Sequence, residues 1–376
     1  MKKILFRKLL SDYLTFAFFA LISTSLVIWV FQAVNYLDIM IEDGRDYLVY
    51  LKFSLLSFPK ILSKILPFVL FFSIFYVTTK YELSNELIIF WNFGVHKMQI
   101  VNFIFVISIL LMLLQIFLAS YIVPYSQDLA RSFLRSSTVN FYENFIKPQK
   151  FNDTIRGVTI YSDGKNKNGF LQNLYIKREL ENNQYQITYA KSGEFKDISN
   201  TTVLVLYEGA TITAKDKDYS NITFSKSDFV LSNLETNTTT YKKTQEISSI
   251  KLFKCIITFY KTKKFSLDVE NCSKKNLHNI LKEFYKRFII PVYIIALSLI
   301  PIFLIILSKE NPKYQKMRLI IFLIGFCIII FSETTIKFIS NSAIQNIGLS
   351  SIPLVLILTI YVFLYFKFNT NFKKLN

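Results

Sequence analysis

The sequence contains 376 residues with a formal net charge of +18, and 52% of its residues are hydrophobic. The apolar residues gather in the first third and the last quarter, whereas the middle is polar and rich in Lys, Asn, Ser and Thr. This division predicts a membrane part and a water-soluble part. A nucleic-acid-binding protein is a poor fit, because the basic residues border apolar runs instead of forming one basic face.

Six apolar runs are long enough to cross a bilayer, which takes about 20 residues of helix. Four of them lie in stretches without charged residues, and two carry charges near one end. The predicted spans are residues 13–35, 57–79, 98–123, 288–308, 318–340 and 350–366. The first run is longer than the apolar part of a signal peptide, and no small-x-small cleavage site follows it. We therefore expect it to remain as a span.

The placement of the positive charges predicts how the spans are oriented. The short segments on one side carry Lys2, Lys3, Arg7, Lys8, Lys80, Lys97, Lys309, Lys313, Lys316, Arg318, Lys367, Lys373 and Lys374. On the other side, the first loop is mostly acidic and residues 341–349 carry no charge. By the positive-inside rule, both termini are expected in the cytoplasm and the long middle segment outside.

Between the third and fourth spans, the periodicity changes to that of strands. Short runs rich in β-branched and aromatic residues alternate with Gly, Asn, Asp and Ser, as in LQNLYIKREL, YQITYAKSGEF and TTVLVLYEGATI. Alternation is clearest at Tyr185, Ile187 and Tyr189, which share one face. We expect an antiparallel, jelly-roll-like sandwich or open roll with one face packed inward and one facing water. The predicted division is membrane helices at 1–123, a periplasmic β domain at 124–280 and membrane helices at 281–376.

Three cysteines occur, of which Cys255 and Cys272 fall in the outer segment and Cys327 in a span. Two cysteines in an oxidising compartment can pair. The sequence does not favour a bond between them, because it cannot place their Cα atoms within bridging distance.

Several kinds of catalytic site are excluded. The two histidines, His96 and His278, are expected on opposite sides of the membrane, and no metal-ligand spacing or nucleotide-binding G-x-x-x-x-G-K-[ST] motif occurs. We therefore expect no metal, no cofactor and no nucleotide hydrolysis by this chain. Ser57 and Lys60 have the spacing of a Ser/Lys membrane peptidase, which is kept as an alternative. The simpler interpretation is that Lys60 reaches the outer interface with its ammonium group.

The segment between the second and third spans, residues 80–97, predicts a short amphipathic helix at the inner surface. Its apolar residues at helical spacing are Leu83, Leu87, Ile88 and Trp91, and Gly94 is typical of a helix stop. Two interpretations stay open at this point. Either the segment only caps the second span, or it docks a cytoplasmic partner through Glu86.

Two pairs of opposite charges lie four residues apart, so each pair shares one helical face. Glu333 and Lys337 lie near the outer end of the fifth span, where they form either an internal ion pair or a contact with an anionic lipid headgroup. Glu283 and Arg287 precede the fourth span, and Pro291 follows in its expected first turns, where Pro is tolerated. For this second pair an interfacial anchor is favoured.

Taken together, three spans, an outer β domain and three further spans resemble the LptF/LptG (YjgP/YjgQ) permeases of Gram-negative lipopolysaccharide export. The resemblance covers nearly the whole chain. Asn85-Glu86-Leu87 and Gly94-Val95 are similar to the family's inner-loop motif, with Asn in place of the usual Ser. The run EFYKRFIIP and the end of the first span favour an LptF-type member. One departure is that Gln32, Asn35 and Tyr36 occupy a stretch where the family often has a basic residue.

The resemblance implies a permease subunit of an ABC transporter in the inner membrane, paired with a paralogous LptG or LptF subunit. It implies that Glu86, with Leu87 and Gly94, couples to a cytoplasmic LptB ATPase dimer. It also implies that Lys337, with Glu333, contacts lipopolysaccharide, which passes through the β domain to the β-roll proteins LptC and LptA. A different class of function, a non-transporting scaffold for a β domain, predicts that changing Glu86 leaves ATPase association intact.

Overall fold

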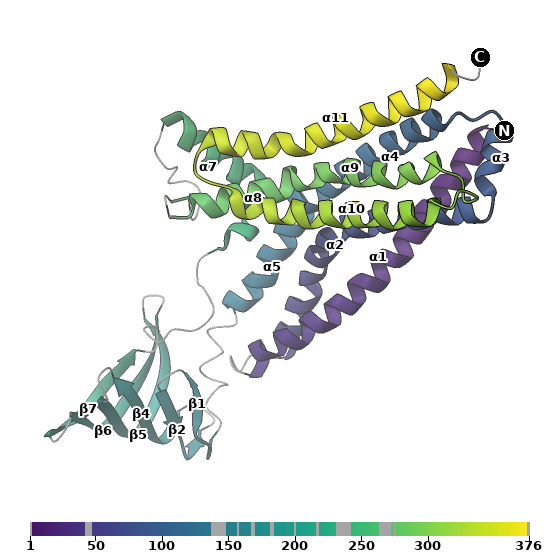
Figure 1. Cartoon of the computed structure of the whole chain (residues 1–376). Helices are drawn as coiled ribbons and strands as arrows, with labels where there is room; N and C mark the ends of the chain where they lie inside the picture. Colours follow the sequence, from purple (N-terminus) through teal and green to yellow (C-terminus); the bar gives the residue numbers. More distant parts are fainter. Residues whose placement is uncertain are drawn as a thin grey trace. The chain divides into compact units, whose positions relative to one another are not determined.

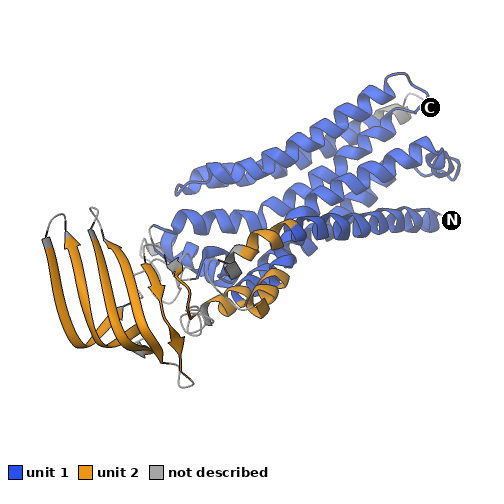
Figure 2. Ribbon diagram, turned by 90° about the horizontal axis from the view of Figure 1, so that it is seen from below, with its two compact units in different colours: residues 1–30, 56–128, 241–376 blue, residues 31–55, 129–240 orange. Residues whose placement is uncertain are grey.

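The structure is a computed structural model that describes residues 2–41, 47–136, 148–155, 158–166, 170–180, 184–198, 201–215, 218–230, 242–262, 272–273 and 275–373. It contains two compact units, coloured separately in Figure 2. The helical unit comprises Met1–Val30, Leu56–Asp128 and Tyr241–Asn376, and the sheet unit comprises Phe31–Leu55 and Leu129–Thr240. The acidic part of the first loop, residues 42–46, lies outside the described residues.

Six helical segments are long and apolar enough to cross a membrane, as predicted. Their elements are α1 (Lys2–Ile41), α2 (Tyr47–Leu83), α4 (Lys97–Phe117) with η1 (Leu118–Ile122) and α5 (Val123–Ser136), α8 (Leu277–Phe288) with η3 (Ile290–Val292), α9 (Tyr293–Leu299) and η4 (Ile300–Ile306), α10 (Tyr314–Thr335) with η5 (Ile336–Phe338), and α11 (Ala343–Lys373) (Figure 1). Most of these helices continue beyond the predicted apolar spans.

The fourth span differs from the expectation at its proline. Its helix begins at Leu277, so Pro291 does not lie near a helix start but in the 3-10 segment η3, between α8 and α9. Pro301 likewise lies at the beginning of η4. The cause is that Pro lacks an N–H and its ring clashes with the preceding turn, which interrupts regular α-helix.

Burial differs sharply between the spans. In the most apolar window of residues 277–306, 78% of residues are buried, and every residue of α9 is buried. The corresponding share is only 11% for the spans at residues 2–37 and 343–369. The fourth span is therefore the centre of the helical unit, whereas α1 and α11 present large apolar surfaces. Such surfaces are typical of helices that face lipid or another subunit.

The described strands form one antiparallel sheet in the order β1-β2-β4-β5-β6-β7, with β3 paired to β4. The strands are β1 (Asn152–Ile155), β2 (Val158–Tyr161), β3 (Gly164–Lys165), β4 (Leu171–Leu180), β5 (Gln184–Ile198), β6 (Thr201–Lys215) and β7 (Asp218–Val230). Apart from the two-residue strand β3, strands consecutive in the sequence pair with each other, which makes a meander. The antiparallel part of the expectation is confirmed, but these strands do not follow the Greek-key path of a jelly roll.

The sheet has one packed face and one open face, as expected, and Tyr185 and Tyr189 lie on the open one. Tyr185 and Tyr189 are 39% and 47% exposed, whereas Thr188 and Ala190 on the opposite face are buried. A side chain does not fit at Gly209, because its Cβ would lie 2.1 Å from the carbonyl oxygen of Tyr189. The packed face carries the core of the sheet, with Leu174, Ile176 and Leu206 buried, while apolar side chains also line the open face, where Ile212 is 41% exposed.

Cys255 and Cys272 form a disulfide, with their Cα atoms 6.2 Å apart. This corrects the sequence-based expectation, because the fold brings the two Cα atoms into the range that a disulfide can bridge. Cys255 belongs to α7 (Ser249–Thr262), and both cysteines pack with Ile280 of α8 in one buried cluster. The bond therefore ties α7 to the chain segment that precedes α8.

Candidate functional site

The turn between α2 and α4 is built around the short helix α3 (Glu86–Asn92). Asn85 precedes it with φ 62°, a left-handed conformation that Asn tolerates. Gly94 follows it with φ 69°. The Gly94 N–H donates to the carbonyl of Trp91 at 2.9 Å, and the Val95 N–H donates to that of Phe90 at 3.0 Å. These two bonds make a Schellman motif, which explains why the helix ends where the sequence predicted.

One side of α3 is buried in the largest apolar cluster of the helical unit. Leu87, Phe90 and Val95 are each 3% exposed and pack there together with Leu9. The other side is open: Ile88 and Ile89 are exposed there, and the exposed Leu83 and Phe93 flank the helix. Helical spacing had grouped Leu87 with Ile88, but only Ile88 faces outward. Leu87 can therefore anchor α3, while a partner would touch its neighbours.

Glu86 lies at the first residue of α3, where a carboxylate favours the positive end of the helix. The Ser84 hydroxyl donates to Glu86 Oε1 at 2.9 Å, and the Lys8 ammonium lies 3.9 Å from Oε2. The Glu86 side chain is 28% exposed, against 66% for Lys8. Its carboxylate is held in position and remains reachable from outside.

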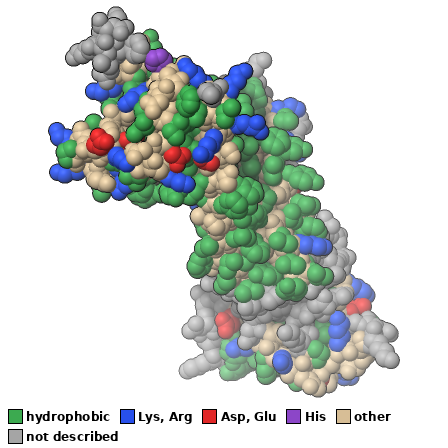
Figure 3. All heavy atoms as spheres, turned by 90° about the vertical axis from the view of Figure 1, so that its right-hand side faces the viewer, with side chains coloured by type: hydrophobic (Ala, Val, Ile, Leu, Met, Phe, Trp, Pro, Cys, Tyr) green, Lys and Arg blue, Asp and Glu red, His purple; other side chains and the backbone are tan. Residues whose placement is uncertain are grey.

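Basic side chains fix this turn to two other parts of the helical unit. Lys2 Nζ donates to the carbonyl of Gly94 at 2.8 Å, and Lys309 Nζ donates to that of Leu83 at 3.0 Å. The Lys309 N–H donates to Glu82 Oε1 at 2.9 Å. Figure 3 views the end that carries both termini, where Lys and Arg side chains gather beside apolar ones. Sequence reasoning placed Lys309 on this side but missed its contact with Glu82, because the two residues are 227 positions apart.

Arg287 is the most enclosed charged residue at the other end of the helical unit, with its side chain 2% exposed. Its guanidinium donates to Glu283 Oε1 at 3.1 Å, completing the predicted pair. It also donates to the carbonyls of Gln245 and Ile247 at 3.0 and 2.8 Å, and to Ser249 Oγ at 2.9 Å. Arg287 is therefore not an exposed interfacial anchor; it joins α8 to the chain that leads into α7.

Glu333 and Lys337 do not form the internal pair that their spacing allows. Glu333 lies in α10 and Lys337 in the 3-10 segment η5, where the helix geometry changes. No ion pair joins them among the described residues, and Lys337 is exposed. Its ammonium group can therefore meet a ligand from outside the bundle.

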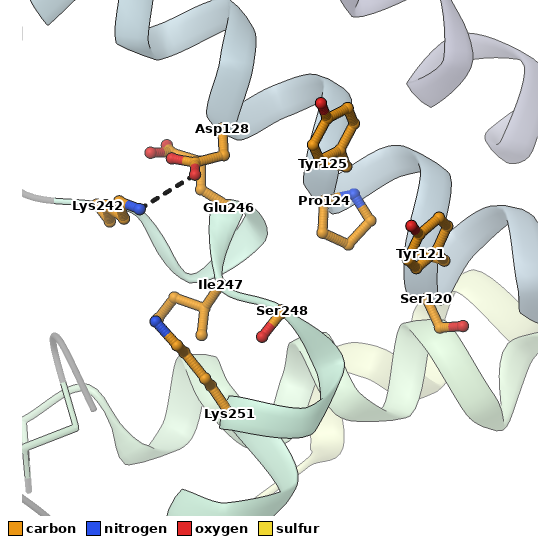
Figure 4. Close-up of a pocket in the computed structure, with 10 residues that line it drawn as sticks. All are labelled: Ser120, Tyr121, Pro124, Tyr125, Asp128, Lys242, Glu246, Ile247, Ser248 and Lys251. Atoms are coloured by element: carbon orange, nitrogen blue, oxygen red, sulfur yellow. Dashed lines mark hydrogen bonds and ion pairs between the residues drawn. The ribbon is translucent and has the colours of Figure 1, made fainter. Parts of the chain in front are cut away.

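A cavity of about 190 Å³ lies between the α4–η1–α5 helix and the segment that leads into α7 (Figure 4). Lys242 donates to Asp128 across it at 3.0 Å, as the dashed line shows. Tyr121 and Tyr125 line it from one side and Lys251 from the other.

The residues of the peptidase alternative do not form an accessible site. The Ser57 side chain is 1% exposed, so a peptide cannot reach its hydroxyl. The Lys60 ammonium donates to Gln245 Oε1 at 2.9 Å. Lys60 therefore belongs to the group of polar side chains that contact each other near the start of α7.

Comparison with known proteins agrees with this architecture. An uncharacterized protein of Rickettsia prowazekii (strain Madrid E), RP871, is 22% identical over 187 residues, which are 50% of this chain and 52% of that protein. The chain thus matches about half the length of this relative. Residues 7–367 match the family described as lipopolysaccharide export system permease LptF/LptG. Because this match covers nearly all of the six spans and the inserted sheet, the chain belongs to the LptF/LptG permease family.

Proposed function

We propose that this chain is a permease subunit of an ABC transporter that extracts lipopolysaccharide from the inner membrane and passes it to a periplasmic β-roll bridge. Membership of the permease family and the six spans with an inserted sheet support this function. The proposed orientation places both termini and α3 in the cytoplasm, since the short segments at that end carry most of the Lys and Arg residues that the positive-inside rule counts. Labelling of engineered thiols that found α3 and the sheet on the same side of the membrane would contradict it.

The observation that carries the proposal is the construction of α3. A helix that ends sharply at both sides, is anchored by Leu87 and presents Glu86 beside exposed apolar residues is suited to receive force from a partner. The proposed partner is a cytoplasmic LptB ATPase dimer, which would supply the ATP hydrolysis. Closure of that dimer would move α3 as one body, and α3 would pass the motion to α2 and α4.

The energetics require such a partner. Moving a lipid with several acyl chains into water exposes tens of methylene groups at about 0.8 kcal/mol each. An unassisted permease cannot supply this free energy, so ATP hydrolysis and a sheltered route are both needed. We propose that the route begins in a cavity between this chain and a paralogous subunit, which the exposed faces of α1 and α11 would help to form.

The sheet offers the next surface along the route. Its open face carries apolar side chains, including Tyr189 and Ile212, on which acyl chains can lie. LptC and LptA are the proposed receivers of the lipid beyond it. We also propose that Lys337, with Glu333 nearby, binds an anionic group of lipopolysaccharide before extrusion. Unchanged photocrosslinking of the lipid to a Lys337→Glu variant would contradict that role.

Replacement of Glu86 by Arg tests the proposal. The change reverses the charge at the start of α3 and places two cations near each other, because Lys8 lies 3.9 Å from the native carboxylate. We expect the variant to lose co-purification with the ATPase, or to keep the ATPase and lose the coupling of ATP hydrolysis to lipid release.

A matched control is Glu310→Arg, which makes the same charge change at an exposed residue in the turn before α10. We expect this variant to assemble and transport like the unmodified protein. If Glu86→Arg folds, binds the ATPase and transports lipid as well as Glu310→Arg does, α3 is not the coupling element. The non-transporting scaffold would then become the better interpretation.

A further inference from the structure

Helix α7 has two apolar faces, and the helical unit covers only one of them. The covered face consists of Leu252, Cys255, Ile256 and Phe259. The second face is 41–81% exposed and consists of Ile250, Phe253, Ile257 and Tyr260, here named the α7 stripe. These positions recur at spacings of three and four residues, so they form one continuous line along the helix. An apolar line of this kind needs an occupant.

Contacts of α7 place it at the level where membrane spans end. At its start, Ser249 Oγ donates to the carbonyl of Ser120 at 2.7 Å, and Ser120 lies within the third candidate span. Farther along, Ile256 and Phe259 pack in the cluster that contains Ile336 and Ile339, at the end of the fifth candidate span. Figure 1 shows α7 at the end of the helical unit opposite to the two termini.

The charges of α7 suit an anionic surface. Its sequence, SIKLFKCIITFYKT, contains Lys but no acidic residue. Lys251 and Lys254 are exposed and follow one edge of the α7 stripe, because they lie one position after Ile250 and Phe253. A helix with an apolar line bordered by lysines is typical of helices that lie in the plane of a membrane interface.

Two tyrosines mark the same level. Tyr121 and Tyr125 lie across the cavity from Lys251, and they are 66% and 69% exposed (Figure 4). Exposed tyrosines are enriched at the headgroup level of membranes, because an apolar ring and a polar hydroxyl suit that boundary. Their position beside the start of α7 is independent of the helix's own pattern.

Contacts inside the helical unit fix the direction in which the α7 stripe faces. The Cys255–Cys272 disulfide holds the middle of the helix, and Arg287 holds its first residue through Ser249 Oγ. The helix therefore cannot turn about its axis to bury the stripe against its own unit. Within the described residues of the helical unit, the stripe stays open to an occupant.

We propose that α7 is an interfacial helix whose stripe enters the boundary of the lipid leaflet at this end of the spans. Lys251 and Lys254 bind the phosphate groups of anionic lipids in that leaflet. The occupant is thus the bilayer surface itself, and α7 anchors the point at which the chain returns from the sheet to the spans. This inference does not depend on the identity of the transported lipid.

Tryptophan quenching tests the position of the stripe in the full-length protein. The chain has two tryptophans, Trp29 and Trp91, and a variant with Phe at both positions provides the background. Ile250→Trp or Ile257→Trp is then introduced and reconstituted in phosphatidylglycerol/phosphatidylcholine vesicles with brominated acyl chains. We expect these probes to lose most of their emission to the brominated lipid and little to aqueous iodide. Tyr219→Trp, on strand β7, is the control and should show the reverse.

Each outcome is informative. Quenching of the stripe by iodide alone would mean that it faces water, and quenching by neither agent would mean that another protein subunit covers it; both results overturn the proposal. The lysines are tested by Lys251→Gln/Lys254→Gln. Vesicles with phosphatidylglycerol should raise the Tm of the unmodified protein above its value in phosphatidylcholine alone, and this shift should be lost in the double variant. An equal shift would overturn the phosphate contact.

Discussion

The two ends of the helical unit differ in how they are held together: one carries the turn around α3, and the other carries the segment that leads into α7. At the end with the termini, α3 is bounded by two left-handed residues, Asn85 and Gly94, and its one ion pair in the described residues is the loose contact of Lys8 with Glu86. At the opposite end, the buried Arg287 makes four hydrogen bonds and a disulfide crosslinks the chain. Contacts between distant residues occur at both ends. Those at α3 include lysine hydrogen bonds at the surface, whereas those at the opposite end are a buried guanidinium and a covalent bond.

This difference separates an element that can move from one that cannot. Besides its backbone bonds and one buried face, the turn around α3 is held by hydrogen bonds from Lys2 and Lys309. Two of these come from lysine side chains at the surface, which can follow a tilt of α3 or re-form at little cost. The segment from Gln245 to Cys255, here named the α7 corner, is held to α8 by the Arg287 guanidinium and to the chain before α8 by the disulfide. It therefore moves only together with α8. In the proposed transporter, the movable turn around α3 would receive the motion of the ATPase, and the start of α7 at the opposite end would move as a rigid part of the bundle.

Replacement of Arg287 should have the largest effect on this comparison. Arg287→Met leaves Glu283 as an unpaired carboxylate in a partly buried site and leaves two carbonyls without their donor. We expect the free energy of unfolding to fall by about 3–5 kcal/mol, as for other buried pairs from which one partner is removed. Denaturant unfolding in detergent measures the change.

The control for this variant is Lys286→Met at the neighbouring exposed position, which should leave the stability within about 0.5 kcal/mol. The double variant Arg287→Met/Glu283→Met should recover part of the loss, because it removes the stranded carboxylate as well. If Arg287→Met is as stable as Lys286→Met, the α7 corner is not held by this residue, and the contrast between the two ends disappears.

Loss of the disulfide should have the next largest effect. The two cysteines are 17 residues apart, and closing a loop of this size stabilises a protein by about 3 kcal/mol. We expect Cys255→Ser/Cys272→Ser to unfold at a lower temperature and to lose the sensitivity of Tm to reductant. Cys327→Ser, which removes the free cysteine, should change neither property. A Tm of the unmodified protein that does not respond to reductant would contradict the expectation.

Features that depend on neighbouring residues in the sequence could be predicted. Apolar runs located all six spans, the strand periodicity located the sheet, and the spacing of Glu283 and Arg287 predicted their pair. The left-handed turn at Gly94 was also predictable, because Gly is the residue best suited to end a helix there.

What the sequence could not provide depends on contacts between distant segments. Nothing in the pattern around Arg287 indicates that its other partners are the carbonyls of Gln245 and Ile247, about 40 residues earlier. The pairing of Cys255 with Cys272 and the outward direction of Tyr185 also depend on how the chain folds back on itself. Pro291 was misplaced because α8 begins well before the apolar run, where the sequence is amphipathic.

Replacement of Gly94, at the end of α3, should have the smallest effect on stability. Gly94 has φ 69°, and an added Cβ would meet no atom closer than 3.9 Å, so the backbone conformation alone opposes a side chain. Gly94→Ala should therefore lower the free energy of unfolding by only about 1–2 kcal/mol. Gly94→Asn should lose less, because Asn adopts this conformation more readily.

The matched control is Gly348→Ala in α11, where a Cβ meets nothing within 4 Å and φ is not positive. Ala is the better helix former there, so this variant should be neutral or slightly more stable. Association with the ATPase distinguishes the two ends. Gly94→Ala should weaken association more than its small loss of stability explains. Arg287→Met should weaken association only in proportion to the fraction of protein that unfolds. If the two variants lose association in the same proportion to stability, α3 moves no more freely than the α7 corner.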